Sequence, residues 1–122
     1  MPTDTDRRVY AMQAEICRGL AHPIRLEVVH LLGAGERTFG ELASHMGIPK
    51  AKLSQHLAVL QRTAIISVHH SGARKSYRLN YPEIESACQA VAATLARRLV
   101  EMREQTNALL RTVRTAGLGR AG

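Results

Sequence analysis

The stretch that decides the fold is FGELASHMGIPKAKLSQHLAVLQR, residues 39–62 of a chain of 122 residues. Its apolar residues recur at three- and four-residue spacing on both sides of Gly47, which predicts two short amphipathic helices joined by a tight turn. Glycine at position 47 can take the positive φ that such a turn often requires, and the small Ala43 lets the helices approach closely. We therefore expect a helix-turn-helix unit whose second helix packs through its leucines.

The second helix of this unit has polar and basic side chains opposite Leu53, Leu57 and Leu60. The candidates on the outward face and its flanks are Lys50, Lys52, Ser54, Gln55, His56 and Arg62. Amides and hydroxyls can read base edges in the major groove of DNA, while cations contact phosphates. We expect Gln55 to be the principal base reader, supported by Ser54 and His56, with the basic residues mainly on phosphates. An ordinary amphipathic surface helix is the alternative for this stretch alone.

The composition favours a polyanionic partner. Seventeen Lys and Arg against ten Asp and Glu give a formal net charge of +7, which suits nucleic acid or an anionic membrane surface. Aromatic residues make up only 3% of the chain, too few for the stacking platforms of single-strand binders, so duplex DNA is favoured. No apolar run approaches the roughly 20 residues of a membrane span, and none follows the N-terminal MPTDTDRR as in a signal peptide. We expect no membrane partner and a cytoplasmic location.

The length predicts one domain covering residues 1–122, with a core motif at about residues 22–79. A first helix is expected from about Asp6 to Leu20, where apolar residues keep helical spacing. His22 can cap a second helix that begins at Pro23 and is apolar enough to be the central core element. His30 on that helix is interpreted as a core residue rather than a ligand.

Residues 65–79 predict a β-hairpin with Gly72 at its bend. Its tip and return strand include His69, His70, Arg74, Lys75 and Arg78. A basic hairpin after a helix-turn-helix is typical of a wing, and we expect Arg74 and Lys75 to contact the phosphate backbone. A solvated hairpin with incidental charge is the alternative.

The last helix is expected from Pro82 to about Thr115, with an apolar stripe along its length. At 1.5 Å per residue it would reach roughly 50 Å, longer than a chain of this size can cover. Part of the stripe therefore needs another surface, and a second copy of the chain would provide it.

Three motifs together resemble the ArsR-type (ArsR/SmtB) bacterial repressors over about residues 11–88. LAHPIRL at residues 20–26 is similar to that family's ALxHPxRL opening. Glu41-Leu42-Ala43, then LSQHL at residues 53–57 and Leu60, resemble its helix-turn-helix. Gly72 followed by YRL at residues 77–79 is similar to its wing. The resemblance implies a mainly α, winged helix-turn-helix homodimer (α-α-α-α-β-β-α) that pairs through its first and last helices, binds a palindromic operator and is released by an inducer.

The chain departs from the family after the second helix of the motif and at the family's metal sites. Thr63-Ala64 stands where the family usually has Ala-Gly, so we expect a differently shaped helix end. Thr38 and Gly40 stand where the family's common metal site has cysteines, and no histidine follows His70 for its other site. His69 and His70 are adjacent on a strand and cannot chelate one ion together. We expect no metal and no cofactor.

Two thiols remain as candidate effector residues, Cys17 and Cys88. If the first and last helices pair in a dimer, the two sulfurs could respond to an oxidant, a reactive sulfur species or a soft metal ion. The alternative is that both are small buried hydrophobes. The family's persulfide sensors do not decide this, because one of their cysteine positions aligns with His30.

Three functions remain in competition. A sequence-specific repressor, with or without thiol sensing, accounts for the uncharged side chains on the outward face. A nonspecific architectural DNA-binding protein would need only the cations. An enzyme is not expected, because the sequence contains no CxxC, phosphate loop or nucleophile–base set.

Overall fold

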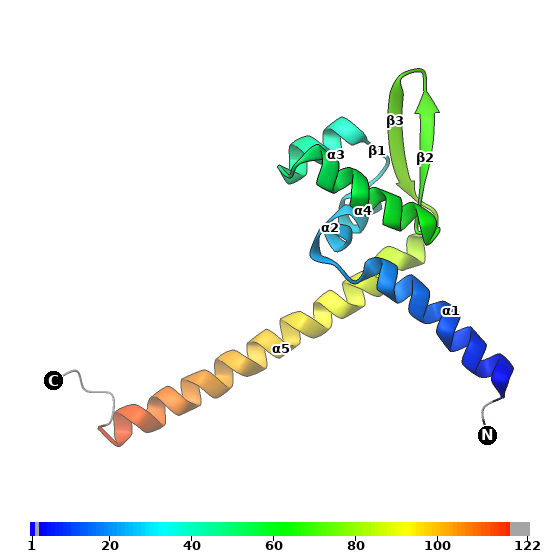
Figure 1. The fold of residues 1–122 in the computed structure, drawn as a ribbon. Helices are drawn as coiled ribbons and strands as arrows, with labels where there is room; N and C mark the ends of the chain where they lie inside the picture. Colours follow the sequence, from blue (N-terminus) through cyan, green and yellow to red (C-terminus); the bar gives the residue numbers. More distant parts are fainter. Residues whose placement is uncertain (2, 118–122) are drawn as a thin grey trace. The chain divides into compact units, whose positions relative to one another are not determined.

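The computed structural model describes residue 1 and residues 3–117, which form five helices and three strands among them (Figure 1). The helices are α1 (Asp4–Leu20), α2 (Pro23–Gly33), α3 (Phe39–Met46), α4 (Lys50–Arg62) and α5 (Pro82–Thr115). The strands are β1 (Arg37–Thr38), β2 (Ile66–Ser71) and β3 (Arg74–Leu79). The chain divides into two compact units, one ending at Ser86 and the other beginning at Ala87.

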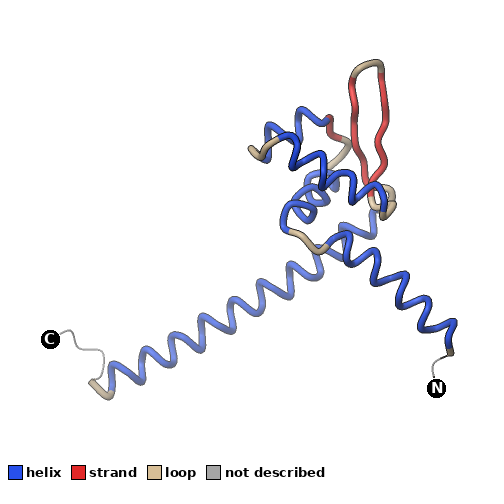
Figure 2. Tube along the Cα trace, in the orientation of Figure 1, coloured by secondary structure: helices blue, strands red, loops and turns tan. Residues whose placement is uncertain are grey.

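The strands form one antiparallel sheet in the order β1-β3-β2, beside the helices of the first unit (Figure 2). The expected hairpin is confirmed, and β2 pairs with β3 from Ile66 opposite Leu79 to Ser71 opposite Arg74. The predicted element order omitted β1, where Arg37 lies opposite Tyr77 and Thr38 opposite Ser76. A strand of two residues has no periodicity from which a sequence could predict it.

Side chains and backbone groups cap the helices at their predicted starts or close to them. α1 begins two residues earlier than expected, because Thr3 and Asp6 form a capping box in which the amide of Asp6 donates to Thr3 Oγ1 at 3.2 Å. The same arrangement of Thr38 and Glu41 starts α3. His22 caps α2 as expected, and its Nδ1 accepts a hydrogen bond from the amide of Ile24 at 3.1 Å.

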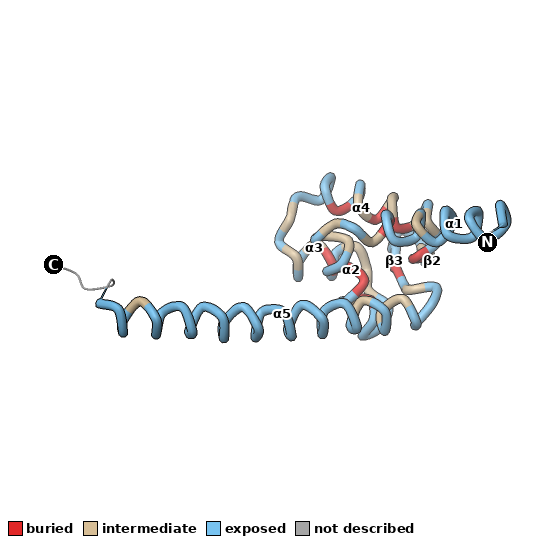
Figure 3. The backbone as a smooth tube through the Cα atoms, turned by 90° about the horizontal axis from the view of Figure 1, so that it is seen from below, coloured by how far each residue is buried: buried red, intermediate tan, exposed pale blue. Residues whose placement is uncertain are grey.

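One hydrophobic core holds the first unit together. Its buried residues come from α2, α3, α4, the start of β2 with the residue before it, and the middle of β3 (Figure 3). They are Val28, Val29, Leu32, Leu42, Leu53, Leu57, Leu60, Ile65, Ile66 and Tyr77. The prediction that α2 is a central core element is confirmed, but His30 is exposed, so its interpretation as a core residue is wrong for the protomer. It lies on the solvent side of α2, next to the buried Val29.

The end of α4 keeps the left-handed geometry that the family's glycine would suit. Ala64 has a φ of 58°, so the expectation of a differently shaped helix end is wrong. The amide of Ile65 donates to the carbonyl of Leu60 and the amide of Ala64 to that of Gln61, which is the hydrogen-bond pattern of a Schellman motif. Asn80 Nδ2 also donates to the carbonyl of Ala64 at 2.8 Å, which fixes the strained residue from the end of β3.

The second unit consists of α5 from Ala87 onward. Among its described residues none is buried, and only Cys88 and Val113 are half-buried. Its exposed apolar side chains keep helical spacing and include Val91, Leu95, Leu99, Met102 and Leu109. The helix is 34 residues long, as the sequence predicted, and its apolar stripe is uncovered in the protomer.

Candidate nucleic-acid interface

The turn between α3 and α4 sets the direction in which α4 leaves the core. Gly47 caps α3 with a φ of 63°, the positive value predicted for it, and its amide donates to the carbonyl of Ala43 at 3.0 Å. Pro49 then precedes α4 and supplies no side-chain cap, so the amides of the first turn of α4 have no side-chain acceptor in the described structure. An open helix N-terminus of this kind favours an anion such as a phosphate.

The helix α4 is strongly two-sided. Leu53, Leu57 and Leu60 are at most 1% exposed and fix one face in the core. The predicted DNA-contacting residues that lie exposed on the rest of the helix are Lys50, Lys52, Ser54, Gln55 and Arg62. Two uncharged hydrogen-bonding side chains in the middle of the exposed face, with cations toward both ends, match what a major groove offers.

His56 lies on the flank of α4, where the wheel placed it, and this flank faces the start of α2. Its ring is half-buried and stacks on the ring of His22 with centroids 4.2 Å apart, and its Nδ1 lies 3.1 Å from Arg25 Nη1. Burial is the main cause that lowers the pKa of His56, and the positive charges of His22, Arg25 and Lys52 lower it further. The ring therefore contacts the start of α2 while part of it stays exposed, and a wheel drawn for α4 alone could not reveal this contact.

The wing is a tight hairpin. Ser71 lies opposite Arg74, which leaves Gly72-Ala73 as a two-residue loop, and Gly72 has a φ of 64° while Ala73 does not have a positive φ. This is the pattern of a type II′ turn, which matches the twist of the flanking strands. Arg74 and Lys75 directly follow the turn and are exposed, as are His70 and Arg78.

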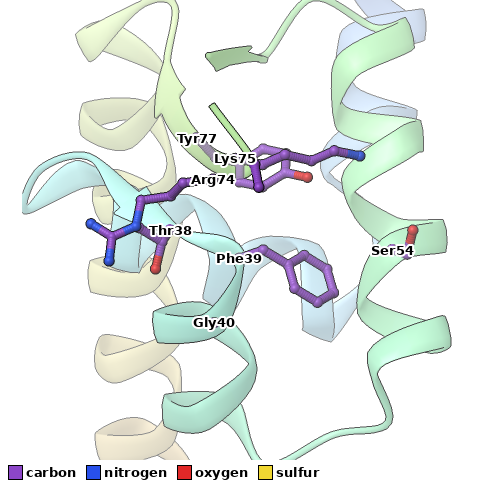
Figure 4. Close-up of a pocket in the computed structure, with 8 residues that line it drawn as sticks. Thr38, Phe39, Gly40, Ser54, Arg74, Lys75 and Tyr77 are labelled. Atoms are coloured by element: carbon purple, nitrogen blue, oxygen red, sulfur yellow. The ribbon is translucent and has the colours of Figure 1, made fainter. Parts of the chain in front are cut away.

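A groove of about 500 Å³ lies between the start of α3, the helix α4 and strand β3. Its lining residues are Thr38, Phe39, Gly40, Ser54, Ala73, Arg74, Lys75 and Tyr77. Figure 4 shows Lys75 extending toward α4 and Arg74 pointing away from it. Burial raises the pKa of Tyr77, so its phenol is neutral at physiological pH.

Five residues of this groove were not predicted as site residues from the sequence: Thr38, Phe39, Gly40, Ala73 and Tyr77. The capping pattern Thr38-x-x-Glu41 was a signal for the start of α3, but nothing local indicates that β3 and α4 would enclose a groove beside it.

The two thiols lie on different helices and form no disulfide. Cys17 is exposed on α1, beside a shallow hollow of about 430 Å³ that Tyr10, Gln13 and Arg18 also line. Cys88 is half-buried on α5. Neither thiol is therefore a fully buried hydrophobe in the protomer. Across the described residues, no group of three or more His, Cys, Asp or Glu side chains could hold a metal ion.

Comparison with known proteins gives a consistent result. A helix-turn-helix domain family matches residues 20–69. The HTH-type transcriptional regulator Rv0081 of Mycobacterium tuberculosis is 33% identical over 90 residues, which cover 73% of this chain and 79% of that protein. Its crystal structure matches with a TM-score of 0.64 over 78% of this chain and 95% of that chain.

Two further relatives extend the comparison. The HTH-type transcriptional repressor SmtB of Mycobacterium tuberculosis is 31% identical over 78 residues, 64% of this chain and 58% of that protein. The solution structure of a homodimeric winged helix-turn-helix domain, Mb0332 from Mycobacterium bovis, described as a possible ArsR-family regulator, is 22% identical. It matches with a TM-score of 0.71 over 80% of this chain and 91% of that chain.

The fold, the two-sided α4 and the basic wing define a winged helix-turn-helix DNA-binding protein. The chain belongs to the ArsR/SmtB-type family of transcriptional regulators. Within the described residues, no helix is long and apolar enough to cross a membrane.

Proposed function

We propose that the protein is a repressor that binds a palindromic operator as a homodimer in the cytoplasm and leaves it when an inducer acts. The observation that carries this proposal is the exposed face of α4, where Ser54 and Gln55 are held outward by the fully buried leucines on the opposite side. Two copies of such a helix, about 34 Å apart, would enter successive major grooves.

Each exposed residue has a proposed role. Gln55 reads a base edge by a bidentate amide contact, and Ser54 supports it with its hydroxyl. Lys50 and Lys52 lie at the uncapped start of α4, where the helix dipole adds to their attraction for a phosphate. Phosphate contacts are also proposed for Arg62, Arg74 and Lys75. We propose no base contact for His56, because its ring contacts His22 and Arg25.

The proposed dimer explains two apolar faces that the protomer leaves uncovered. On α1, Val9 is 56% and Met12 63% exposed, and on α5, Leu95 and Leu99 are each more than half exposed. A monomeric protein rarely exposes so much contiguous apolar surface without a partner. The homodimeric state of Mb0332 supports a second copy as that partner.

For the release step we propose thiol chemistry at Cys17 and Cys88. The exposure of Cys17 supports access by an oxidant, a reactive sulfur species or a soft metal ion. Oxidation by diamide would remove two electrons and two protons from two thiols and join them in one disulfide. Such a bond would constrain the proposed dimerisation helices, and through them the spacing of the two α4 helices.

The proposal is tested with a duplex selected from random DNA by the protein. Anisotropy measured at fixed salt should give a specificity ratio of about 10³ or more over unrelated DNA. Equal affinity for both would indicate an architectural DNA-binding protein instead. A protomer-sized mass in light scattering would contradict the dimer.

The release step is tested separately with reduced protein and protein treated with diamide, polysulfide or Hg(II). The affinity of the parent should fall, while a Cys17→Ser/Cys88→Ser double variant should keep its affinity. If parent and variant respond alike, the protein is a repressor without thiol sensing.

A further inference from the structure

The side chain of Arg25 on α2 connects three helices. Its Nε donates to the carbonyl of Gly19 at 2.7 Å and its Nη2 to that of Arg18 at 3.2 Å, which are carbonyls in the last turn of α1. Its Nη1 lies 3.1 Å from Nδ1 of His56 on α4. Because a guanidinium only donates hydrogen bonds, Nδ1 of His56 must be the acceptor, and the ring must be neutral with its proton on Nε2.

His22 supplies the second ring of the cluster. Its Nδ1 accepts from the amide of Ile24 at 3.1 Å as the cap of α2. The planes of the His22 and His56 rings are tilted by 38° with their centroids 4.2 Å apart. Two neutral imidazoles can stack at this distance, whereas two imidazolium ions beside a guanidinium would repel one another.

Gly19, whose carbonyl accepts from Arg25, lies against the end of α4. A Cβ added at Gly19 would be 2.8 Å from Thr63 Oγ1, so these two elements touch without room for a side chain between them. Thr63 in turn donates to the carbonyl of Val59 and is fixed to α4. Arg25 therefore bonds to the segment of α1 that touches the end of α4, in addition to its contact with His56 on α4 itself.

The charged neighbours of His56 lower its pKa. His22 and Arg25 face it from α2 and its cap, and Lys52 faces it from its own helix. From α1 it is the carbonyl groups of Arg18 and Gly19 that reach Arg25, while the Arg18 guanidinium pairs with Glu15 at the exposed surface. The named ionisable neighbours are basic, so proton uptake by His56 is opposed by charge as well as by burial.

We propose that His22, Arg25 and His56 form a proton-sensitive positioning cluster that holds α4 for DNA binding only while the His56 ring is neutral. A proton on Nδ1 of His56 would point at the Arg25 guanidinium, break their hydrogen bond and free α4 from the start of α2. The inference rests on the proposed DNA contact of α4. It predicts that acidification weakens DNA binding, although protonation of histidines elsewhere adds positive charge that favours binding.

The first test measures the Kd for the selected duplex at pH 7.5 and at pH 5.8, at one ionic strength. For each variant, the Kd at pH 5.8 is divided by the Kd at pH 7.5. The parent should lose affinity several-fold at the lower pH, by at most about fivefold for each His56 ring with a pKa below ~6.5. His56→Gln keeps an acceptor for Arg25 at every pH, so its ratio should stay near one. His45→Gln removes an exposed histidine from α3 and should show the same ratio as the parent. An equal ratio for parent and His56→Gln would overturn the proposal, and so would global unfolding of the parent at pH 5.8.

The second test needs no DNA. NMR of the ring carbons and nitrogens should find His56 as the Nε2–H tautomer at pH 7.5, with a midpoint below the ~6.5 of a free histidine. The Nδ1–H tautomer, or a midpoint at or above that value, would overturn the proposal. If the protein selected no duplex, the proposed function would fail, and the ring titration would still decide for or against the cluster.

Discussion

Replacing Ala64 by glycine should stabilise the protein, because the backbone at this position is left-handed. The φ of 58° costs a residue with a Cβ roughly 1–2 kcal/mol. Glycine removes that cost but adds unfolded-state freedom worth about 0.4–1 kcal/mol. The Ala64 side chain is exposed, so no buried packing is removed. The hydrogen bonds to Gln61 and Asn80 use the backbone of residue 64 and remain.

The net expectation for Ala64→Gly is a gain of about 0.5–1 kcal/mol, or a few degrees in Tm for a unit of this size. Urea and thermal unfolding, measured at one protein concentration, provide the assay. Ala51→Gly is the matched control, because Ala51 is exposed in the first turns of α4 and its replacement should cost up to about 1 kcal/mol. The same replacement of alanine by glycine should thus raise the free energy of unfolding at position 64 and lower it at position 51. Unchanged or reduced stability of Ala64→Gly would refute the strain argument.

Three further substitutions test the recognition surface and the core. Gln55→Ala should cost about 1–3 kcal/mol on the selected duplex and relax base preference at one position per half-site, and unaltered base preference in a binding-site selection would remove Gln55 as a reader. Lys75→Ala should weaken binding to all duplexes and reduce the salt slope of log K by about 0.9 for each phosphate that Lys75 neutralises, so an identical slope would argue against a wing on the phosphate backbone. Leu57→Ala, at a side chain only 1% exposed, should lower the free energy of unfolding by about 2–5 kcal/mol. A decrease below about 1 kcal/mol would mean that the leucine face of α4 is not packed in the core as described.

Local patterns predicted most of the fold. Three- and four-residue spacing identified the helices, Gly47 and Gly72 identified the turns, and the leucines of α4 identified its buried face. Each of these patterns involves residues only a few positions apart, so it can be recognised in the sequence without knowledge of the tertiary structure.

The features that local patterns did not predict depend on contacts with residues distant in the sequence. The ring of His56 contacts residues 31 and 34 positions away, and a wheel drawn for α4 alone does not show these contacts. Ala64 keeps a left-handed φ because Asn80 and the backbone of α4 hold it there, against the preference of alanine itself. The groove beside Lys75 exists only because β3 and α4 are brought together by the core.

The measurement that tests the central claim most directly is base-analogue interference on the selected duplex. Purines are replaced one at a time by 7-deaza analogues, which lack the N7 acceptor in the major groove, and the Kd of each duplex is measured. If the exposed face of α4 reads the major groove from two paired protomers, affinity should fall at two clusters of positions about one helical turn, ~10 bp, apart. A duplex that tolerates every replacement, or that has a single sensitive cluster, would contradict the account.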